Sequence, residues 1–173
     1  MSNQHQDSYC ILVDQPYPPV QANTRRKDYA RAMLSNVGSG NSEMSAVSLY
    51  FYNSVILTPE QEQIARCFHQ IGVVEMHHLK IFATLAFQMG EDPRLWSFQN
   101  RSRPTYWSPA CNRYPRCVRQ VIENAIRGEE AAIQKYTYQL ETIRDTNLVD
   151  NLTRIILDEK RHIEVFQSML PSL

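Results

Sequence analysis

Two segments of the sequence contain the same pair of residues that can bind a metal ion, a glutamate followed three positions later by a histidine. The first pair is Glu75 and His78, and the second is Glu159 and His162. In each segment an apolar residue follows the histidine directly, and a phenylalanine follows it after four positions. Residues three apart lie on the same face of an α-helix, so each pair would direct a carboxylate and an imidazole to one place. One such pair alone would be explained more simply as a structural pair in a helical core.

Two other segments share a second pattern, which begins with a glutamate. Glu43 and Glu129 are each followed by an alanine after three positions, an aliphatic residue after four and a tyrosine after seven, Tyr50 or Tyr136. Offsets of three, four and seven all return to one face of an α-helix. Glu130 is a rival to Glu129, but only Glu129 has this spacing to its neighbours. An apolar helix face points to the protein interior, where an unpaired carboxylate is costly.

Together the four segments predict a buried cluster of four carboxylates and two imidazoles, which makes chemical sense around metal ions. The predicted ligands are Glu43, Glu75, His78, Glu129, Glu159 and His162. Two divalent cations would balance the four negative charges. In the arrangement of di-iron and di-manganese bundles, Glu75 and Glu159 would bridge both ions, while each remaining ligand would serve mainly one. A mixed nitrogen and oxygen set without thiolate suits iron or manganese, although zinc could occupy it adventitiously.

Four long helices are needed to bring these segments together, and the sequence predicts them over residues 42–57, 58–89, 116–144 and 148–169. Thr58 is the expected N-cap of the second helix and Pro59 its first residue. Short connections join the helices within each half, whereas a long crossover over about residues 90–115 joins the halves. This order predicts an all-α protein, a four-helix bundle of the ferritin-like kind made of two helical hairpins.

The segments outside the four helices are expected to be less regular. Residues 1–25 predict an extended N-terminal arm, because the stretch DQPYPPVQ contains three prolines. Residues 26–173 are expected to form the bundle domain, with a short helix near residues 25–34 at its start. Asn41 or Ser42 is the expected N-cap of the next helix. The crossover has four prolines, two tryptophans and no helical period, so we expect an ordered connection that buries its aromatic side chains.

Composition limits the classes of function. The chain has 173 residues, of which 43% are hydrophobic, enough for one domain with a sizeable core. Basic and acidic residues both number 18, so the charge gives no support to a nucleic-acid partner. No uncharged apolar run is long enough to cross a membrane, and the polar N-terminus shows no signal peptide, so we expect a cytoplasmic protein without a membrane partner.

The four cysteines are Cys10, Cys67, Cys111 and Cys117, and they form no CxxC pair. This spacing argues against a rubredoxin-type iron site and against a thioredoxin-like motif. Cys111 and Cys117 could form a disulfide, but a reduced chain is the simpler expectation.

Over residues 42–169 the four segments, their order and their aromatic partners resemble the ferritin-like di-metal carboxylate superfamily. Within it, the chain is most similar to the rubrerythrin-like proteins and to the manganese-catalase and spore-coat branch. The resemblance implies the six ligands named above. It also implies that Tyr50 and Tyr136 hold the bridging carboxylates by hydrogen bonds and, together with Glu75 and Glu159, take part in catalysis.

The resemblance also concerns the surroundings of the histidines. Asp158 matches a position that often orients a ligand histidine in the family, here His78, whereas the corresponding residue in the first half is Val74. The resemblance therefore implies an asymmetric site. Rubrerythrins proper have a further glutamate where this chain has Ala132, and they append a rubredoxin domain. Both departures count against an NADH-linked peroxidase cycle within one chain.

The expected function is that of a di-metal oxidoreductase with iron or manganese, catalase-like or peroxidase-like, acting on hydrogen peroxide or dioxygen. We expect a homo-oligomer, and an iron enzyme would need a separate electron donor. Three alternatives stay open at this point: a ferroxidase or iron-storage protein, a coat or shell protein stabilised by metal, and a di-iron oxygenase acting on an organic substrate.

Overall fold

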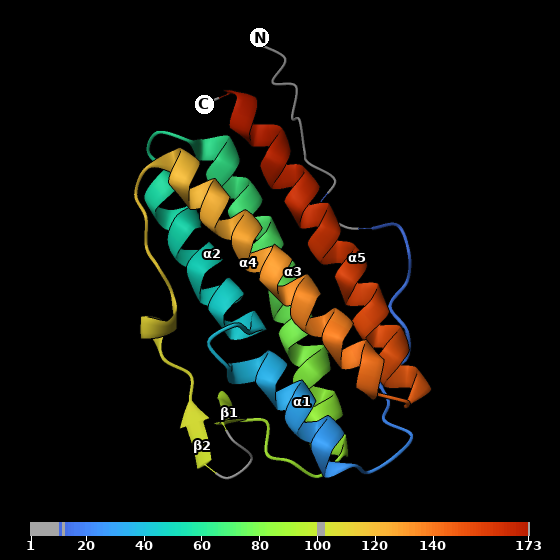
Figure 1. Cartoon of the computed structure of the whole chain (residues 1–173). Helices are drawn as coiled ribbons and strands as arrows, with labels where there is room; N and C mark the ends of the chain where they lie inside the picture. Colours follow the sequence, from blue (N-terminus) through green and yellow to red (C-terminus); the bar gives the residue numbers. More distant parts are fainter. Residues whose placement is uncertain (1–10, 12, 100–102, 173) are drawn as a thin grey trace.

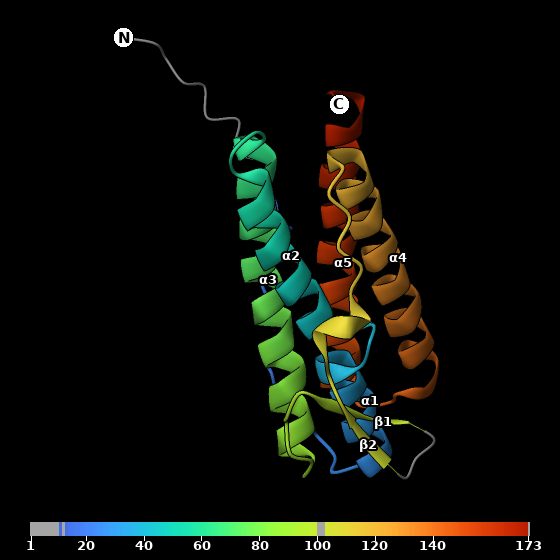
Figure 2. The ribbon, with the colours of Figure 1, turned by 90° about the vertical axis from the view of Figure 1, so that its left-hand side faces the viewer.

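Four long helices form the main part of the computed structural model, which describes residue 11, residues 13–99 and residues 103–172 (Figure 1). They are α2 (Glu43–Leu57), α3 (Glu62–Gln88), α4 (Val118–Thr142) and α5 (Thr146–Met169). α2 packs mainly against α3, and α4 mainly against α5, so the bundle consists of two helical hairpins (Figure 2). The predicted all-α, ferritin-like bundle is therefore confirmed.

Apolar side chains fill the bundle in two clusters, one toward each end. One cluster joins α1 (Lys27–Gly38) to the second half of α3 and the first half of α5, and it includes Leu34 and Phe82. The other joins the first halves of α3 and α4 to the end of α5, and it includes Phe68 and Phe166. Polar residues at the middle of the helices are thus enclosed above and below by closely packed apolar side chains.

The long crossover contains a small β-hairpin that the sequence analysis did not predict. Strands β1 (Trp96–Gln99) and β2 (Arg103–Tyr106) pair antiparallel, with Trp96 opposite Tyr106, and a short 3-10 turn, Pro109–Cys111, follows. The end of the crossover is attached to the start of α2, because Trp107 Nε1 donates to Ser45 Oγ at 2.9 Å. The crossover therefore helps to fix the first turns of the helix on which Glu43 lies.

The start of α3 differs from the prediction. Thr58 is not its N-cap but lies at the end of α2, where its hydroxyl donates to the Ser54 carbonyl at 2.7 Å. Its backbone is helical, with φ −53° and ψ −42°, whereas an N-cap is extended. α3 therefore begins at Glu62, after Pro59. The first helix, α1, is also longer than predicted and ends at Gly38.

Residues 13–24, which we call the strap, belong to the predicted N-terminal arm and contain neither helix nor strand. The strap runs beside α5 (Figure 1). The buried side chain of Arg154 donates to the carbonyls of Gln15 at 2.8 Å and Val13 at 3.1 Å. The strap is therefore attached to α5.

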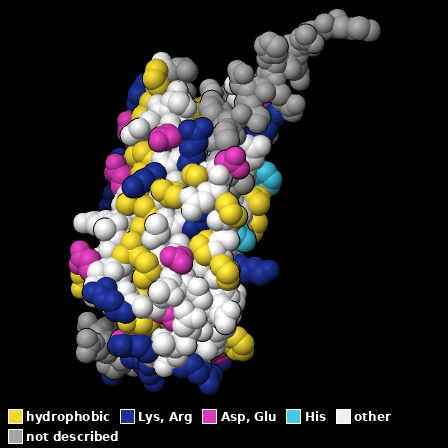
Figure 3. All heavy atoms as spheres, turned by 90° about the vertical axis from the view of Figure 1, so that its right-hand side faces the viewer, with side chains coloured by type: hydrophobic (Ala, Val, Ile, Leu, Met, Phe, Trp, Pro, Cys, Tyr) yellow, Lys and Arg dark blue, Asp and Glu magenta, His cyan; other side chains and the backbone are white. Residues whose placement is uncertain are grey.

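The surface on the α5 side intersperses basic, acidic and apolar side chains (Figure 3), as the balanced charge suggests. No helix among the described residues is long and apolar enough to span a membrane. Cys67, Cys111 and Cys117 are free thiols, and Cys10 lies outside the described residues.

Candidate metal centre

The four helices bring all six sequence-predicted ligands into one buried cluster at the middle of the bundle. The cluster consists of two overlapping groups, Glu43, Glu75, His78 and Glu159 in one, and Glu75, Glu129, Glu159 and His162 in the other. In each group the candidate ligand atoms lie within 4.8 Å of one another. Every one of these side chains belongs to a residue with 2% exposure or less. Glu75 and Glu159 belong to both groups, which is the position required of bridging carboxylates.

Helical spacing explains how each histidine meets its glutamate. His78 Nδ1 lies 3.1 Å from Glu75 Oε2 on α3, and His162 Nδ1 lies 3.0 Å from Glu159 Oε2 on α5. Each Nδ1 also faces the glutamate of the other helix, His78 at 3.3 Å from Glu159 Oε1 and His162 at 3.0 Å from Glu75 Oε1. The two halves thus interlock around a common centre.

The two predicted tyrosines reach the cluster, but their partners differ from those expected. Tyr50 of α2 donates to Glu129 of α4, and Tyr136 of α4 donates to Glu43 of α2. The sequence analysis expected them to hold the bridging Glu75 and Glu159. α2 and α4 contact each other across the bundle, so each tyrosine side chain is long enough for its hydroxyl to reach the glutamate of the other helix.

The rival residue Glu130 is exposed, whereas Glu129 points into the core. Burial, with Glu75 and Glu159 nearby, raises the pKa of the Glu129 carboxyl to about 8. Burial and the same two neighbours also raise the pKa of Glu43 well above its ordinary value. The two outer glutamates therefore favour their protonated form when no cation is present.

The pKa values of Glu75 and His78 shift in the directions that favour the charged forms of both groups. Burial by itself would raise the pKa of Glu75, but His162 and His78 lower it below its usual range. For His78 burial by itself would lower the pKa, since it disfavours the charged imidazolium, but Glu159 and Asp158 raise the pKa well above its ordinary value. The cluster is held together without metal by protons and imidazolium charges, which are the charges that divalent cations replace.

Two carboxylate oxygens indicate that the donor set fits cations better than protons. Glu75 Oε1 and Glu159 Oε1 are buried and have no hydrogen-bond partner among the described residues, although each faces a histidine nitrogen closely. Buried polar atoms are normally satisfied, so an oxygen without a partner calls for an explanation. Oxygen and imidazole donors that converge in this way suit iron or manganese.

The outer nitrogens of the two histidines have different surroundings. His78 Nε2 lies 3.2 Å from Asp158 Oδ2 and 3.1 Å from the hydroxyl of Tyr17. His162 Nε2 is buried and has no hydrogen-bond partner among the described residues. Tyr17 was missed by the sequence analysis, because a proline-rich arm has no periodicity to show which residue faces inward.

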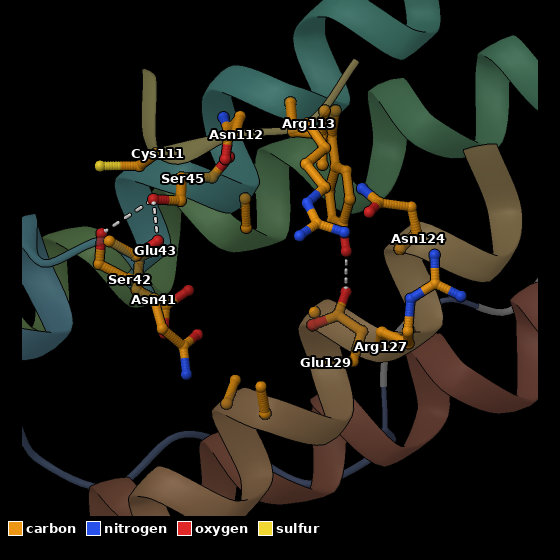
Figure 4. A pocket seen from close by; sticks show the side chains of 18 of the residues that line it. Asn41, Ser42, Glu43, Ser45, Cys111, Asn112, Arg113, Asn124, Arg127 and Glu129 are labelled. Carbon is orange, nitrogen blue, oxygen red and sulfur yellow. Dashed lines mark hydrogen bonds between the residues drawn. The ribbon is translucent and has the colours of Figure 1, made fainter. Parts of the chain in front are cut away.

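A pocket of about 320 Å³ connects the cluster to solvent between α2 and α4. Its inner wall includes Glu43 and Glu129, which are buried, and Ala132 lies beside them. Its outer wall includes the exposed Arg113 and Arg127 (Figure 4). The position at which rubrerythrins proper have a further glutamate is thus part of this opening, and the alanine leaves it free.

Comparisons with known proteins identify a family and solved structures of similar fold. The rubrerythrin family model matches residues 38–170. Among solved structures, the crystal structure of KatB, a manganese catalase from Anabaena PCC7120, matches with a TM-score of 0.79 and 20% identity over 92% of this chain and 78% of that one. A second crystal structure, of wild-type KatB from Anabaena, gives the same values. A comparison with curated protein sequences gives no significant match.

Proposed function

The chain belongs to the rubrerythrin family, and from this premise we propose that it is a di-metal oxidoreductase that acts on hydrogen peroxide in a catalase-like reaction. The observation that supports this proposal most directly is the pair of overlapping donor groups that share Glu75 and Glu159. The similarity of the fold to a manganese catalase supports it further. We propose manganese as the physiological metal.

We favour this reaction over a peroxidase cycle, which would depend on a separate redox partner. A peroxidase needs an electron donor, and the chain has no CxxC pair. In a catalase reaction one hydrogen peroxide is reduced to two waters while a second is oxidised to dioxygen, so electrons and protons balance without a donor. Two manganese ions bound by the six residues would supply the two-electron redox chemistry.

The residues of the chain would bind the two ions, enclose the site and supply protons. Glu43 and His78 would hold one ion, and Glu129 and His162 would hold the other. Glu75 and Glu159 would hold both ions. We propose the pocket as a route for peroxide, because Glu43 and Glu129 line it. We propose that Tyr50 and Tyr136, whose hydroxyls donate to Glu129 and Glu43 at the pocket wall, keep protons beside these carboxylates between the two half-reactions.

The homo-oligomer expected from the sequence is also a proposal. α2 and α3 expose apolar side chains that a second copy could cover, with 70% exposure at Phe51, 57% at Val55 and 50% at Met76. Light scattering of the purified protein tests this and separates a small oligomer from a storage cage, which would be a very large particle.

The experiment for the proposed function is elemental analysis of protein purified without added metal, followed by oxygen release from hydrogen peroxide. We expect two manganese ions per chain and oxygen evolution. Glu75→Ala, which removes a ligand common to both donor groups, should lose both, whereas His162→Ala should lose oxygen evolution and keep one bound ion. Two iron ions without oxygen evolution would move the assignment to peroxidase or ferroxidase chemistry. Folded protein that binds no metal in the presence of either ion would contradict the metal centre.

A further inference from the structure

We infer that the strap makes the two metal subsites unequal, with Tyr17 as a positioning residue that strengthens binding at the subsite of His78. This inference rests on the proposed function, because it concerns the same metal centre. We name the subsites by their histidines. The His78 subsite contains Glu43, and the His162 subsite contains Glu129.

The first step of the argument concerns the orientation of the His78 ring. Its Nδ1 faces Glu75 and Glu159 inside the cluster, so Nε2 points away from the centre. There it meets the Asp158 carboxylate at 3.2 Å and the Tyr17 hydroxyl at 3.1 Å. A carboxylate at the outer N–H of a ligand histidine fixes the ring and makes it a more basic ligand.

The second step concerns what keeps this carboxylate in place. Tyr17 donates to Asp158 Oδ2, and the backbone amide of Val13 donates to Asp158 Oδ1 at 3.3 Å. Arg154 Nη1 lies 2.7 Å from Asp158 Oδ1. Both carboxylate oxygens are therefore held, and of the three groups that contact them besides His78, two belong to the strap.

The third step concerns the strap itself, which is anchored on both sides of Tyr17. The Arg154 guanidinium lies over the Tyr17 ring, 4.3 Å from its centroid, and binds the carbonyl of Gln15. Further along, the amides of Asn23 and Thr24 donate to Asp145 at 2.8 and 3.0 Å. The hydroxyl of Tyr17 is thus placed before any metal arrives, so little ordering cost remains when the ion binds.

The fourth step is the comparison with the other subsite. The residue on α3 that corresponds to Asp158 is Val74, whose side chain cannot accept a hydrogen bond. His162 Nε2 has no hydrogen-bond partner among the described residues. Because only His78 has an outer carboxylate, we expect the His78 subsite to bind the first metal ion and to release it last.

The test is a titration of the metal-free full chain with Mn²⁺, in which the electron paramagnetic resonance signal of free Mn²⁺ reports binding. Tyr17→Phe removes only the hydroxyl and keeps the ring on Arg154. We expect it to weaken the tighter of two binding steps about 10-fold, the lower end of the effect of losing such an outer partner, and to leave the weaker step unchanged. Tyr138→Phe, at a tyrosine that is 67% exposed on α4, is the matched control.

Two backgrounds assign the effect to one subsite. In His162→Ala, which leaves the His78 subsite, Tyr17→Phe should still weaken Mn²⁺ binding about 10-fold. In His78→Ala it should have no effect. Equal weakening in both backgrounds, or none in either, would overturn the inference. A wild-type chain that binds no metal would overturn the proposed function as well, whereas two bound ions that ignore Tyr17→Phe would overturn this inference alone.

A second measurement needs no change at Tyr17. Because linkage is reciprocal, a metal ion in the His78 subsite should stabilise the strap by as much as the strap stabilises the ion. Hydrogen exchange of the Val13 amide, which donates to Asp158, should slow on Mn²⁺ binding in the wild type and in His162→Ala. It should not change in His78→Ala, and slowing there would contradict the inference.

Discussion

Tyr136 of α4 donates a hydrogen bond to Glu43 of α2 in the buried wall of the pocket, and this bond joins the two hairpins of the bundle. Tyr136→Phe should leave the glutamate without its donor. Since an unsatisfied buried acceptor costs about 1–3 kcal/mol, the free energy of unfolding of the metal-free protein should fall by that amount.

Urea unfolding measures this change, and Tyr138→Phe on the exposed side of α4 again serves as the control. An unchanged unfolding midpoint in Tyr136→Phe would show that the bond contributes nothing to stability. The same experiment on Tyr50→Phe probes the equivalent bond to Glu129.

The stability of the metal-free protein should depend on pH through Glu129. Its pKa is raised from 4.5 to about 8 in the folded state. Between these values the folded chain holds a proton that the unfolded chain has lost, so the free energy of unfolding falls as the pH rises toward 8. Urea midpoints measured from pH 5 to pH 8.5 without metal should show this fall.

Glu129→Gln isolates the contribution of this carboxyl. The amide cannot ionise, so we expect a shallower pH dependence over the same window, with a higher midpoint relative to the wild type near pH 8. An identical slope in the two proteins would show that other groups, such as the buried Glu43, control the dependence.

Gly38 is required by the crossover rather than by its own helix. A Cβ at this position would lie 2.5 Å from the Leu95 carbonyl carbon, and backbone cannot move aside as a side chain can. Gly38→Ala should therefore destabilise the protein by about 1–3 kcal/mol. Gly128→Ala is the contrasting variant, because a Cβ there meets nothing within 4 Å in the middle of α4.

We expect Gly128→Ala to stabilise the protein by about 0.5–1 kcal/mol, since alanine is the better helix residue. Thermal unfolding of both variants tests the pair. If Gly38→Ala were as stable as the wild type, the close approach of α1 and β1 would not be maintained in solution.

Asp145 should contribute more to the free energy of unfolding than an ordinary helix N-cap does. Its carboxylate is buried and accepts from the amides of Asn147 and Leu148 at the start of α5, and also from the amides of Asn23 and Thr24. Asp145→Ala should therefore cost about 2 kcal/mol, the upper end of the range for a lost cap.

Asp150→Ala, at an exposed position one turn further along α5, should change stability little. Chemical unfolding of the two variants gives the difference. A similar small loss in both would mean that the strap gains nothing from Asp145.

The helices, and the helix faces on which the six candidate ligands lie, could be predicted because they follow local rules. Glu75 and His78 lie on one face by helical spacing alone, and the repeat of that spacing in α5 identified the second pair. The hairpin at Trp96 was not predictable in this way, because β2 is exposed along its whole length and shows no alternation. The N-cap prediction at Thr58 was wrong because a threonine before a proline is compatible with the end of one helix as well as with the start of the next.

Tyr17 illustrates what local rules cannot supply. Its role depends on a contact with Asp158, which is 141 residues away in the chain, and no pattern in the extended arm selects it. The partners of Tyr50 and Tyr136 were also mistaken for a similar reason, since spacing gives the helix face but not the residue on the neighbouring helix that the face meets.

The same distance in the chain has a consequence for assembly. The contacts of the strap with Arg154 and Asp158 join residues that are 139 and 141 positions apart in the sequence. Contacts between such distant segments form late in folding, after the local helical hairpins. We therefore expect Tyr17 to reach Asp158 in the last steps of folding, after the helices that carry the six candidate ligands have packed together.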